Sequence, residues 1–274
     1  KAVSAMQKLV FSDKVVAVLN QGPSAVQLAT MPIAEQAQVV QLAVASSHKN
    51  VTGSGNKWVF RLNGTDKMFG GAVVDYMVKE LGLKRFAILH LSDEFGYGAR
   101  EEYESRLALY GLEPVSVDVM STGDKDLRSQ LMNARRANAD ALLLAVSYHD
   151  GAIIARQAKQ LRLDVVIAGL AAFSNPKLIE LGGNDVIGVL HGTPFFPQPD
   201  VPHMAEFMKR IEARGYPADV YSAQGYDGMM LLAEAIRNKG ADPDSIRLGL
   251  MEIKDFQGVS APESFYVAPN GEFI

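Results

Sequence analysis

Two small polar turns near the start of the chain carry hydroxyl groups that could bind an anion. Residues 15–19 form a short apolar run typical of a buried parallel strand, and the polar, glycine-containing turn 20–24 follows it. A second apolar run, 39–44, leads into the polar turn 45–48. Parallel strands end at one edge of their sheet, where backbone N–H groups and a helix N-terminus can bind an anion. The candidate hydroxyls are those of Ser24, Ser46 and Ser47. Either turn alone is also explained by the general preference of turns for polar residues.

Aromatic side chains follow the next group of predicted strands. Phe95 and Tyr97 come after one strand, and Tyr148 and Phe173 come after two later ones. Hydroxyl and backbone N–H groups suit the polar head of a small molecule, and aromatic walls suit an apolar body. The two sets together predict a site for a small molecule with both parts. The alternative for each aromatic residue is that it covers a sheet edge.

The composition describes a globular chain that is long enough for two domains. It has 274 residues, of which 48% are hydrophobic and 21% charged. The net charge of −4 and the pI near 5.8 offer no basic field, so neither nucleic acid nor anionic lipid is expected as a partner. Cysteine is absent, which excludes thiol catalysis, disulfides and cysteine-bound metal. No apolar run approaches the roughly 20 residues of a membrane span, so no direct insertion is expected.

Strand and helix patterns alternate along the chain, which predicts an α/β fold with parallel sheet covered by helices on both faces. Strands are expected at 15–19, 39–44, 57–62, 85–91, 113–120, 140–146 and 165–168. Helices are expected from Ser24, the predicted N-cap, and at 67–81, up to residue 109, and at 126–137, 151–161, 176–181, 203–214 and 220–238. Pro32 predicts an interior break in the first of these. The extended run 186–196 ends in a stretch rich in proline, with Pro194, Pro197, Pro199 and Pro202, which fits a segment that crosses between lobes. A hairpin is expected at 264–271.

The motifs of common nucleotide-binding and hydrolytic enzymes are missing. No glycine-rich phosphate-binding turn and no nucleophile elbow stands between a strand and a helix. The histidines lack metal-binding spacing. We therefore expect no enzymatic activity, no metal and no cofactor. The alternative is an α/β enzyme with His149 or His191 as general base, although no nucleophile or partner carboxylate is identifiable by spacing.

The order and spacing of several short segments carry a family resemblance, although none is diagnostic alone. They are 1–9, 22–29, 44–47 with 51–52, Phe60 and Arg61 with Asp66, 93–98, 156–158 with Leu163, and 221–227. Over its whole length the chain resembles the periplasmic solute-binding proteins of the leucine/isoleucine/valine-binding type. These proteins are the extracytoplasmic receptors of ABC importers.

The resemblance implies the type I periplasmic-binding-protein fold, with two Rossmann-like lobes joined by crossing hinge strands. The amino-terminal lobe is expected at 1–66 plus 198–274, and the carboxy-terminal lobe at 67–197. A ligand would be trapped between the lobes by hinge closure. The first lobe would fix its carboxylate and ammonium through the turns that contain Gly22, Ser24, Ala45, Ser46 and Ser47. The second lobe would close on it with Phe95 and Tyr148.

One departure from the family concerns the ligand's ammonium group. The loop after the strand 165–168 often carries an acidic residue in this family, but here the loop contains Ala171 and Phe173 and no acid. A desolvated ammonium without a counter-charge costs several kcal/mol. We therefore expect a branched-chain amino acid or a related small carboxylate with an aliphatic or aromatic body, and Ala171 favours the carboxylate. Asp93 or Asp150 could supply the missing charge.

The resemblance also implies a partner and a compartment. The partner is the membrane permease of an ABC importer, and the protein is expected to be periplasmic or otherwise extracytoplasmic, with an export signal outside the present sequence. The alternative is a ligand-sensing domain of a larger receptor. The chain starts within an amphipathic helical pattern and stops where a hairpin partner is expected, so we expect a fragment that is truncated at both ends.

Overall fold

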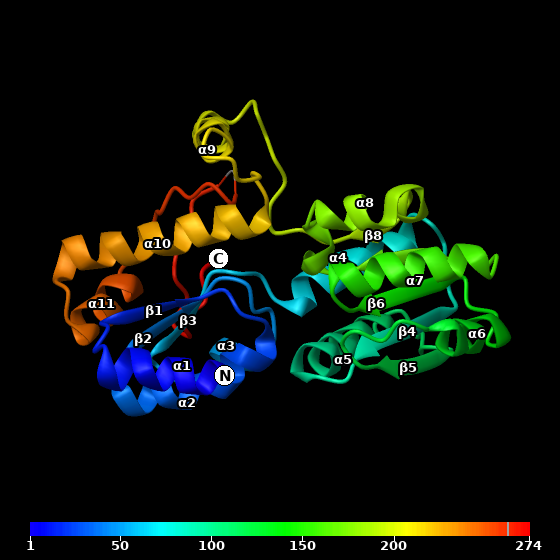
Figure 1. Cartoon of the computed structure of the whole chain (residues 1–274), viewed down its shortest axis with the longest axis horizontal. Helices are drawn as coiled ribbons and strands as arrows, with labels where there is room; N and C mark the ends of the chain where they lie inside the picture. Colours follow the sequence, from blue (N-terminus) through cyan, green and yellow to red (C-terminus); the bar gives the residue numbers. More distant parts are fainter. Residues whose placement is uncertain (262) are drawn as a thin grey trace. The chain divides into compact units, whose positions relative to one another are not determined.

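The computed structural model describes residues 1–261 and 263–274, and the chain forms two compact units. Unit 1 comprises Lys1–Thr65 and Pro194–Ile274, and unit 2 comprises Asp66–Thr193. The chain therefore leaves unit 1 after Thr65 and returns to it at Pro194. Each unit has one parallel sheet with helices on both faces, as Figure 1 shows. The α/β architecture predicted from the alternating pattern is confirmed.

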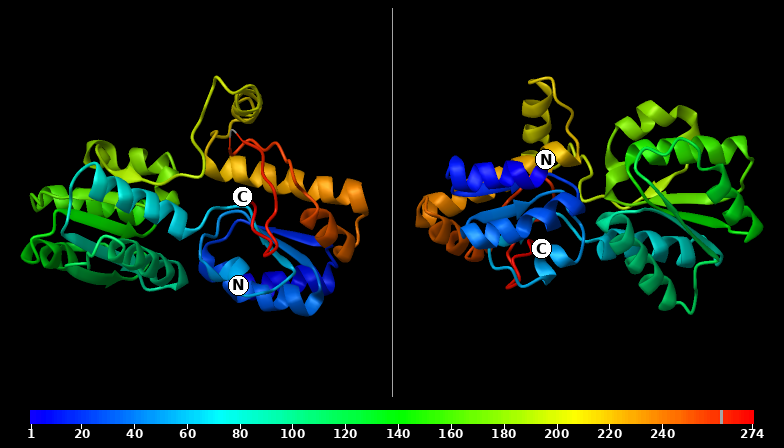
Figure 2. Two further views of the ribbon diagram at one scale, coloured as in Figure 1. Left: turned by 180° about the vertical axis from the view of Figure 1, so that it is seen from behind. Right: turned by 60° about the horizontal axis from the view of Figure 1, so that its bottom comes forward.

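Unit 1 is built on the parallel sheet β1-β2-β3. Its strands are β1 (Ala17–Asn20), β2 (Val40–Ala43) and β3 (Val59–Arg61). Its helices are α1 (Ala2–Gln7), the π-helix η1 (Lys8–Ser12), α2 (Ser24–Ala37), α3 (Asn50–Gly53), α9 (Pro202–Glu212), α10 (Val220–Lys239) and α11 (Pro243–Met251). Figures 1 and 2 show α1 and α2 on one face of this sheet and α10 and α11 on the other. Leu42 packs with Leu231 and Leu250, whereas its neighbour Ala43 packs with Met31, because successive strand residues point to opposite faces.

Unit 2 is built on a five-stranded parallel sheet of order β5-β4-β6-β7-β8. Its strands are β4 (Phe86–Leu91), β5 (Ser116–Met120), β6 (Ala141–Ala145), β7 (Val166–Gly169) and β8 (Leu190–His191). Its helices are α4 (Asp66–Lys79), α5 (Glu94–Ala108), α6 (Arg128–Arg136), α7 (Tyr148–Gln160), α8 (Lys177–Gly182) and the 3₁₀ turns η2 (Ala171–Ser174) and η3 (Gly183–Val186). Ile88 packs with Tyr103 of α5 and Leu89 packs with Leu131 of α6, so the two faces of the sheet have separate cores.

Two expectations about α2 are wrong. Pro23 is the N-cap, and Ser24 is the first helical residue. The helix also continues through Pro32 to Ala37, although proline removes one helical hydrogen bond. The buried side chains of Met31 and Ile33 flank the proline, and their packing holds the helix together across it.

Several helix starts and one whole helix differ from the sequence predictions. Residues 94–98 belong to α5 because the side chain of Asp93 accepts a hydrogen bond from the Gly96 N–H and caps the helix. Similarly, Ser147 caps α7, so the helix begins at Tyr148 and not at Gly151. The helix α11 was not predicted. In the tail, residues 263–274, the expected hairpin is present in a short form. Tyr266 and Ile274 exchange two backbone hydrogen bonds, and the Ala268 N–H donates to the Glu272 carbonyl across the turn at 269–271.

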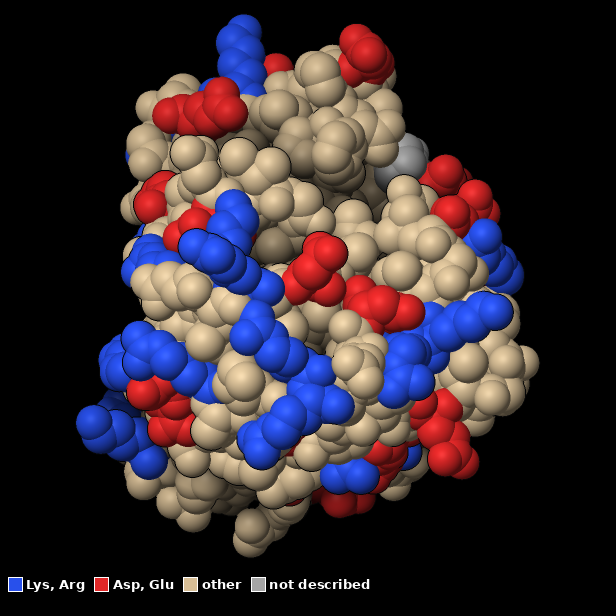
Figure 3. Space-filling view, turned by 90° about the vertical axis from the view of Figure 1, so that its right-hand side faces the viewer, with Lys and Arg blue, Asp and Glu red and all other residues tan. Residues whose placement is uncertain are grey.

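Basic side chains gather on a surface of unit 2, which Figure 3 shows. Several arginines of this unit donate to backbone carbonyls at the ends of helices. Arg85 Nε lies 2.8 Å from the Asn138 carbonyl oxygen, and an Arg156 Nη lies 2.6 Å from that of Leu181. Carbonyls at a helix C-terminus lack helical donors, so these guanidinium groups stabilise the fold by supplying hydrogen bonds to them.

The helices of the described residues include none with the length and apolar character of a membrane span.

A polar cluster between α4 and α5 makes part of the stability of unit 2 dependent on pH. The Asp75 carboxylate accepts from both Arg106 and Tyr110, with Arg106 Nε at 2.6 Å. Its pKa is lowered from 3.8 to about 2, first by the hydrogen bond from Arg106, with burial opposing. A lowered pKa in the folded state stabilises the fold above pH 4, and this contribution is lost as the pH falls toward 2.

We expect Asp75→Asn to lower the free energy of unfolding by about 1 kcal/mol at pH 6, because this partly exposed cluster is screened by water. The loss should shrink at pH 2.5, where the wild-type carboxylate is being protonated. Urea unfolding of the full chain at the two pH values measures both losses. Asp126→Asn, which removes the exposed pair with Arg128, is the matched control and should change stability by less than about 0.5 kcal/mol. Equal losses for Asp75→Asn at the two pH values would contradict the assignment.

Candidate functional site

The turn after β1 is held by Asn20. Its Oδ1 accepts from the Gly22 N–H at 2.8 Å, and its Nδ2 donates to Gln27 Oε1 at 2.7 Å. A Cβ on Gly22 would lie 2.8 Å from a methyl carbon of Val26 and 2.9 Å from Asn20 Oδ1. The turn therefore passes too close to the start of α2 for a side chain at this position. Of the residues predicted as ligand-binding, Gly22 and Ser24 lie here.

The turn after β2 contacts the turn after β1 through two serine hydroxyls. Ser46 Oγ lies 3.1 Å from Ser24 Oγ, and both side chains are buried. Ser47 is also buried, and the carbonyl of Ala45 accepts from Asn63 Nδ2 at 3.0 Å. When one hydroxyl of the pair donates to the other, the accepting hydroxyl keeps its own hydrogen for a further acceptor. The structure thus brings Ser24 and Ser46, which are 22 residues apart, into one hydrogen-bonding group.

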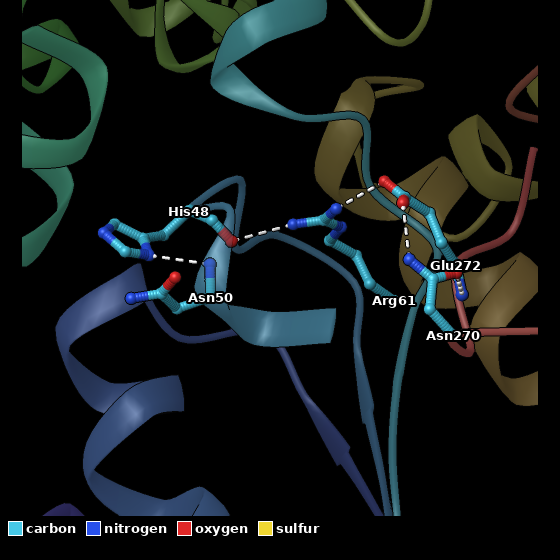
Figure 4. Close-up of polar contacts among 5 residues, drawn as sticks. All are labelled: His48, Asn50, Arg61, Asn270 and Glu272. Carbon is cyan, nitrogen blue, oxygen red and sulfur yellow. Dashed lines mark hydrogen bonds and ion pairs between the residues drawn. The ribbon is translucent and has the colours of Figure 1, made fainter. Parts of the chain in front are cut away.

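A buried arginine holds the far end of the same turn, as Figure 4 shows. Arg61 Nη1 donates to the carbonyl of His48 at 2.8 Å, and its Nη2 forms an ion pair with Glu272. The ring of His48 accepts from the Asn50 N–H at 3.1 Å through Nδ1. Glu272 Oε2 in turn accepts from Asn270 at 3.3 Å. Arg61 and Glu272 were not predicted as site residues, although a charge within the apolar strand 57–62 was a signal that could have found Arg61.

The predicted aromatic residues of unit 2 lie at helix starts. Phe95 is in the first turn of α5, half-buried, and packs against both cores of its unit. Tyr148 is the first residue of α7, half-buried, with its ring centroid 4.1 Å from that of His149. Ala171 begins η2 after β7 and is partly exposed. Part of each of Phe95, Tyr148 and Ala171 is therefore accessible to solvent. That these three residues contact a ligand stays a prediction.

Phe173 is placed differently because its ring is almost fully buried within unit 2. A Cβ on Gly151 would lie 2.7 Å from Phe173 Cε1, and a Cβ on Gly169 would lie 2.5 Å from Cε2. The ring therefore fills the space left by two glycines, one on α7 and one on β7. Its role as a ligand wall stays a prediction, whereas its packing in the core is observed.

The acidic residues that could replace the missing acid both have structural partners. Asp93 caps α5, with Oδ1 2.8 Å from the Gly96 nitrogen. The carboxylate of Asp150 accepts from Ser147 Oγ at 2.7 Å, and its side chain is buried. Each carboxylate already contributes to the start of a helix. The loop after β7 itself contains no acidic residue.

The two histidines considered as general bases lie at the ends of different strands, His149 in the first turn of α7 after β6 and His191 as the last residue of β8. His191 Nδ1 lies 3.4 Å from the Gly192 carbonyl oxygen, and partial withdrawal of the ring from water lowers its pKa. The ring of His149 lies against that of Tyr148 at an interplanar angle of 31°. Among the described residues, no group of three histidine, aspartate or glutamate side chains is arranged to hold a metal ion. A hollow of about 260 Å³ in unit 1, between α9, α10 and residues 256–259, contains none of the residues predicted for the site.

A comparison with protein families gives a match that covers the whole chain. The chain belongs to the periplasmic binding protein family, whose model matches residues 1–274. The predicted family and type I fold are thereby confirmed. The parallel sheets with helices on both faces described above are the architecture of the solved structures that it matches.

Relatives and solved structures extend this assignment. The chain is 21% identical over 248 residues to Leu/Ile/Val-binding protein homolog 3 of Brucella melitensis, covering 89% of this chain and 66% of that protein. It is 29% identical to the leucine-binding protein LivK of Thermotoga maritima, with a TM-score of 0.90 over 100% of this chain and 78% of that one. A solute-binding protein of an ABC transporter from R. palustris, solved in complex with benzoate, has the same fold with a TM-score of 0.89 at 19% identity, over 100% of this chain and 76% of that one. The chain spans just under two thirds of the length of four of the curated relatives that it matches, 65% to 66% of each.

Proposed function

We propose that this chain is the ligand-binding part of an extracytoplasmic solute receptor of an ABC importer. Its ligand is a branched-chain amino acid or a related small carboxylate, captured without chemical turnover. The observation that carries the proposal is the contact between Ser24 and Ser46, which joins the turns after two parallel strands at the edge where α/β sheets bind ligands. The family membership and the relatives named for leucine, isoleucine and valine support it.

The two units serve as the two lobes in this proposal. The turns that contain Gly22, Ser24, Ala45, Ser46 and Ser47 bind the ligand's carboxylate, and the half-buried aromatics of unit 2 cover its apolar body. A ligand that contacts both lobes shifts the population toward a closed form, since it binds that form better than the open one. The importer's permease then recognises the closed form. In this proposal the protein is exported from the cytoplasm and binds its ligand outside it.

Within this class we propose that a carboxylate without an ammonium group is preferred. The loop after β7 offers Ala171 where an acid would pair with the ammonium, and Asp93 and Asp150 are used as helix-start partners. An ammonium taken out of water without a counter-charge costs more than one or two hydrogen bonds return. The benzoate complex of the R. palustris protein supports this choice, because the fold there accepts an aromatic acid.

A thermal-shift series on the full chain tests the proposal. We expect small aliphatic and aromatic acids, benzoate among them, to raise the melting temperature more than leucine does at equal concentration. Binding stabilises the folded state in proportion to the logarithm of ligand concentration over Kd, so the ranking of shifts gives the ranking of affinities. An equal or larger shift with leucine would refute the carboxylate preference. No shift with any acid or amino acid would refute the receptor function.

A serine variant tests where the carboxylate binds. Ser46→Ala removes one hydroxyl from the buried pair, and we expect it to weaken binding of the best ligand by about 10- to 100-fold, the value of one hydrogen bond to a charged group. Ser245→Ala, at the start of α11, is the matched control and should leave affinity unchanged. Calorimetric titration gives both Kd values. Equal affinities for the two variants would place the carboxylate elsewhere.

A further inference from the structure

The serine turn after β2 is held at both ends by side chains from the end of β3. At its start, the carbonyl of Ala45 accepts from Asn63, which follows β3. At its end, the carbonyl of His48 accepts from Arg61, the last residue of β3. Between these two carbonyls lie Ser46 and Ser47. The segment that carries both serines is therefore fixed at its two limits by the neighbouring strand.

Each of these two side chains is held in turn by a residue from the last third of the chain. Asn63 Oδ1 accepts from Gln224 Nε2 of α10 at 2.8 Å, and Gln224 is buried. Arg61 forms its ion pair with Glu272 in the tail. The two residue pairs, Asn63 with Gln224 and Arg61 with Glu272, thus connect the serine turn to segments that lie 161 and 211 residues further along the chain.

The Arg61 side chain is not needed to join β3 to the tail, because the backbone already does so. The Arg61 N–H donates to the carbonyl of Gly271 at 2.9 Å, and the Phe273 N–H donates to the carbonyl of Arg61 at 2.8 Å. The guanidinium adds a different connection, from Glu272 to the His48 carbonyl. It does so with only 1% of the side chain exposed, and a buried charge is costly unless it is paired and hydrogen-bonded.

We propose that Arg61 and Glu272 form a positioning pair that preorganises the serine turn for the ligand's carboxylate. This inference rests on the proposed function. The planar guanidinium can reach the His48 carbonyl and Glu272 at once because its donors are fixed in a fork. The ion pair with Glu272 fixes the orientation of the Arg61 guanidinium, and the hydrogen bond from Arg61 to the His48 carbonyl then holds the turn in place. A binding group held in place before the ligand arrives costs less ordering on binding.

The test compares two arginine-to-lysine variants of the full chain. Arg61→Lys keeps the charge but cannot make both contacts from one ammonium. Arg247→Lys is the matched control in the same unit. The Arg247 guanidinium lies 5.6 Å from the centroid of the Trp58 ring and is paired with Asp244. Trp58 directly precedes β3, so this contact lies at the opposite end of the strand from Arg61. Both variants alter a partly or fully buried arginine, and only the first alters the serine turn.

Two readouts separate positioning from general stability. For the best ligand of the thermal-shift series, we expect Arg61→Lys to raise Kd about tenfold or more, and Arg247→Lys to change it less than about twofold. Without ligand, hydrogen exchange at the amides of residues 45–48 should be faster in Arg61→Lys than in Arg247→Lys when both are compared at equal loss of melting temperature. An equal Kd for the two variants, or equal exchange at these amides, would overturn the proposal.

A second variant keeps the test decisive if Arg61→Lys does not fold. Glu272→Gln retains an acceptor for the guanidinium but removes the ion pair, and we expect a smaller change in the same direction for both readouts. The exchange measurement needs no ligand. If no compound binds the wild-type chain, the proposed function fails while the exchange result still decides whether the pair holds the turn.

Discussion

Gly96→Ala is expected to prevent unit 2 from reaching its native packing. Gly96 lies in the first turn of α5, directly over the end of β4. A Cβ at this position would lie 2.7 Å from the carbonyl carbon of Leu91 and closer still to its oxygen. Both are backbone atoms of a buried strand, so no side-chain rotation can relieve the overlap. We expect a loss of at least about 3 kcal/mol in the free energy of unfolding, the upper part of the range for overpacking.

A second glycine of unit 2 supplies the control for this prediction. Gly71 is also buried and helical, but a Cβ there would lie 3.6 Å from Arg106 Nε, an ordinary contact. Gly71→Ala should therefore leave stability unchanged or raise it by up to about 1 kcal/mol, because alanine favours the helix. Urea unfolding of the full chain compares the variants. Similar stabilities for Gly96→Ala and Gly71→Ala would show that α5 can shift away from β4, which would contradict the packing described here.

The alternation of strands and helices was predictable because most strands lie within short apolar stretches, of which β4 and β6 are the clearest. The ends of the helices were harder to predict, because the residue types that begin a helix also occur in turns. Asp93 and Ser147 lie directly after predicted strands, and each caps a helix through the backbone N–H three residues ahead. The sequence contained the capping residue in both cases, and local pattern alone did not show which of its two uses applied.

The candidate site was predictable only in its local parts. The serine turns could be proposed because each follows an apolar run at a strand end. The pairs that hold the serine turn could not be predicted, because Arg61 and Glu272 are 211 residues apart and Gln224 and Asn63 are 161 apart. No periodicity connects such residues. Only the packing of α10 and the tail onto β3 brings them together, which is why a buried charge in a strand was the sole hint.

Phe173→Ala is expected to have the second largest effect, and it decides between two roles for this residue. The ring is 3% exposed and fills the space that Gly151 and Gly169 leave between α7 and β7. Removing it leaves a cavity lined by two residues without side chains, which cannot collapse to fill it. We expect a loss of about 3–5 kcal/mol in the free energy of unfolding. Phe196→Ala, at a phenylalanine that is 70% exposed, is the control and should cost less than about 0.5 kcal/mol. If Phe173→Ala instead retains stability and weakens ligand binding, the ring is a ligand wall, because a core residue cannot be removed without leaving its cavity behind.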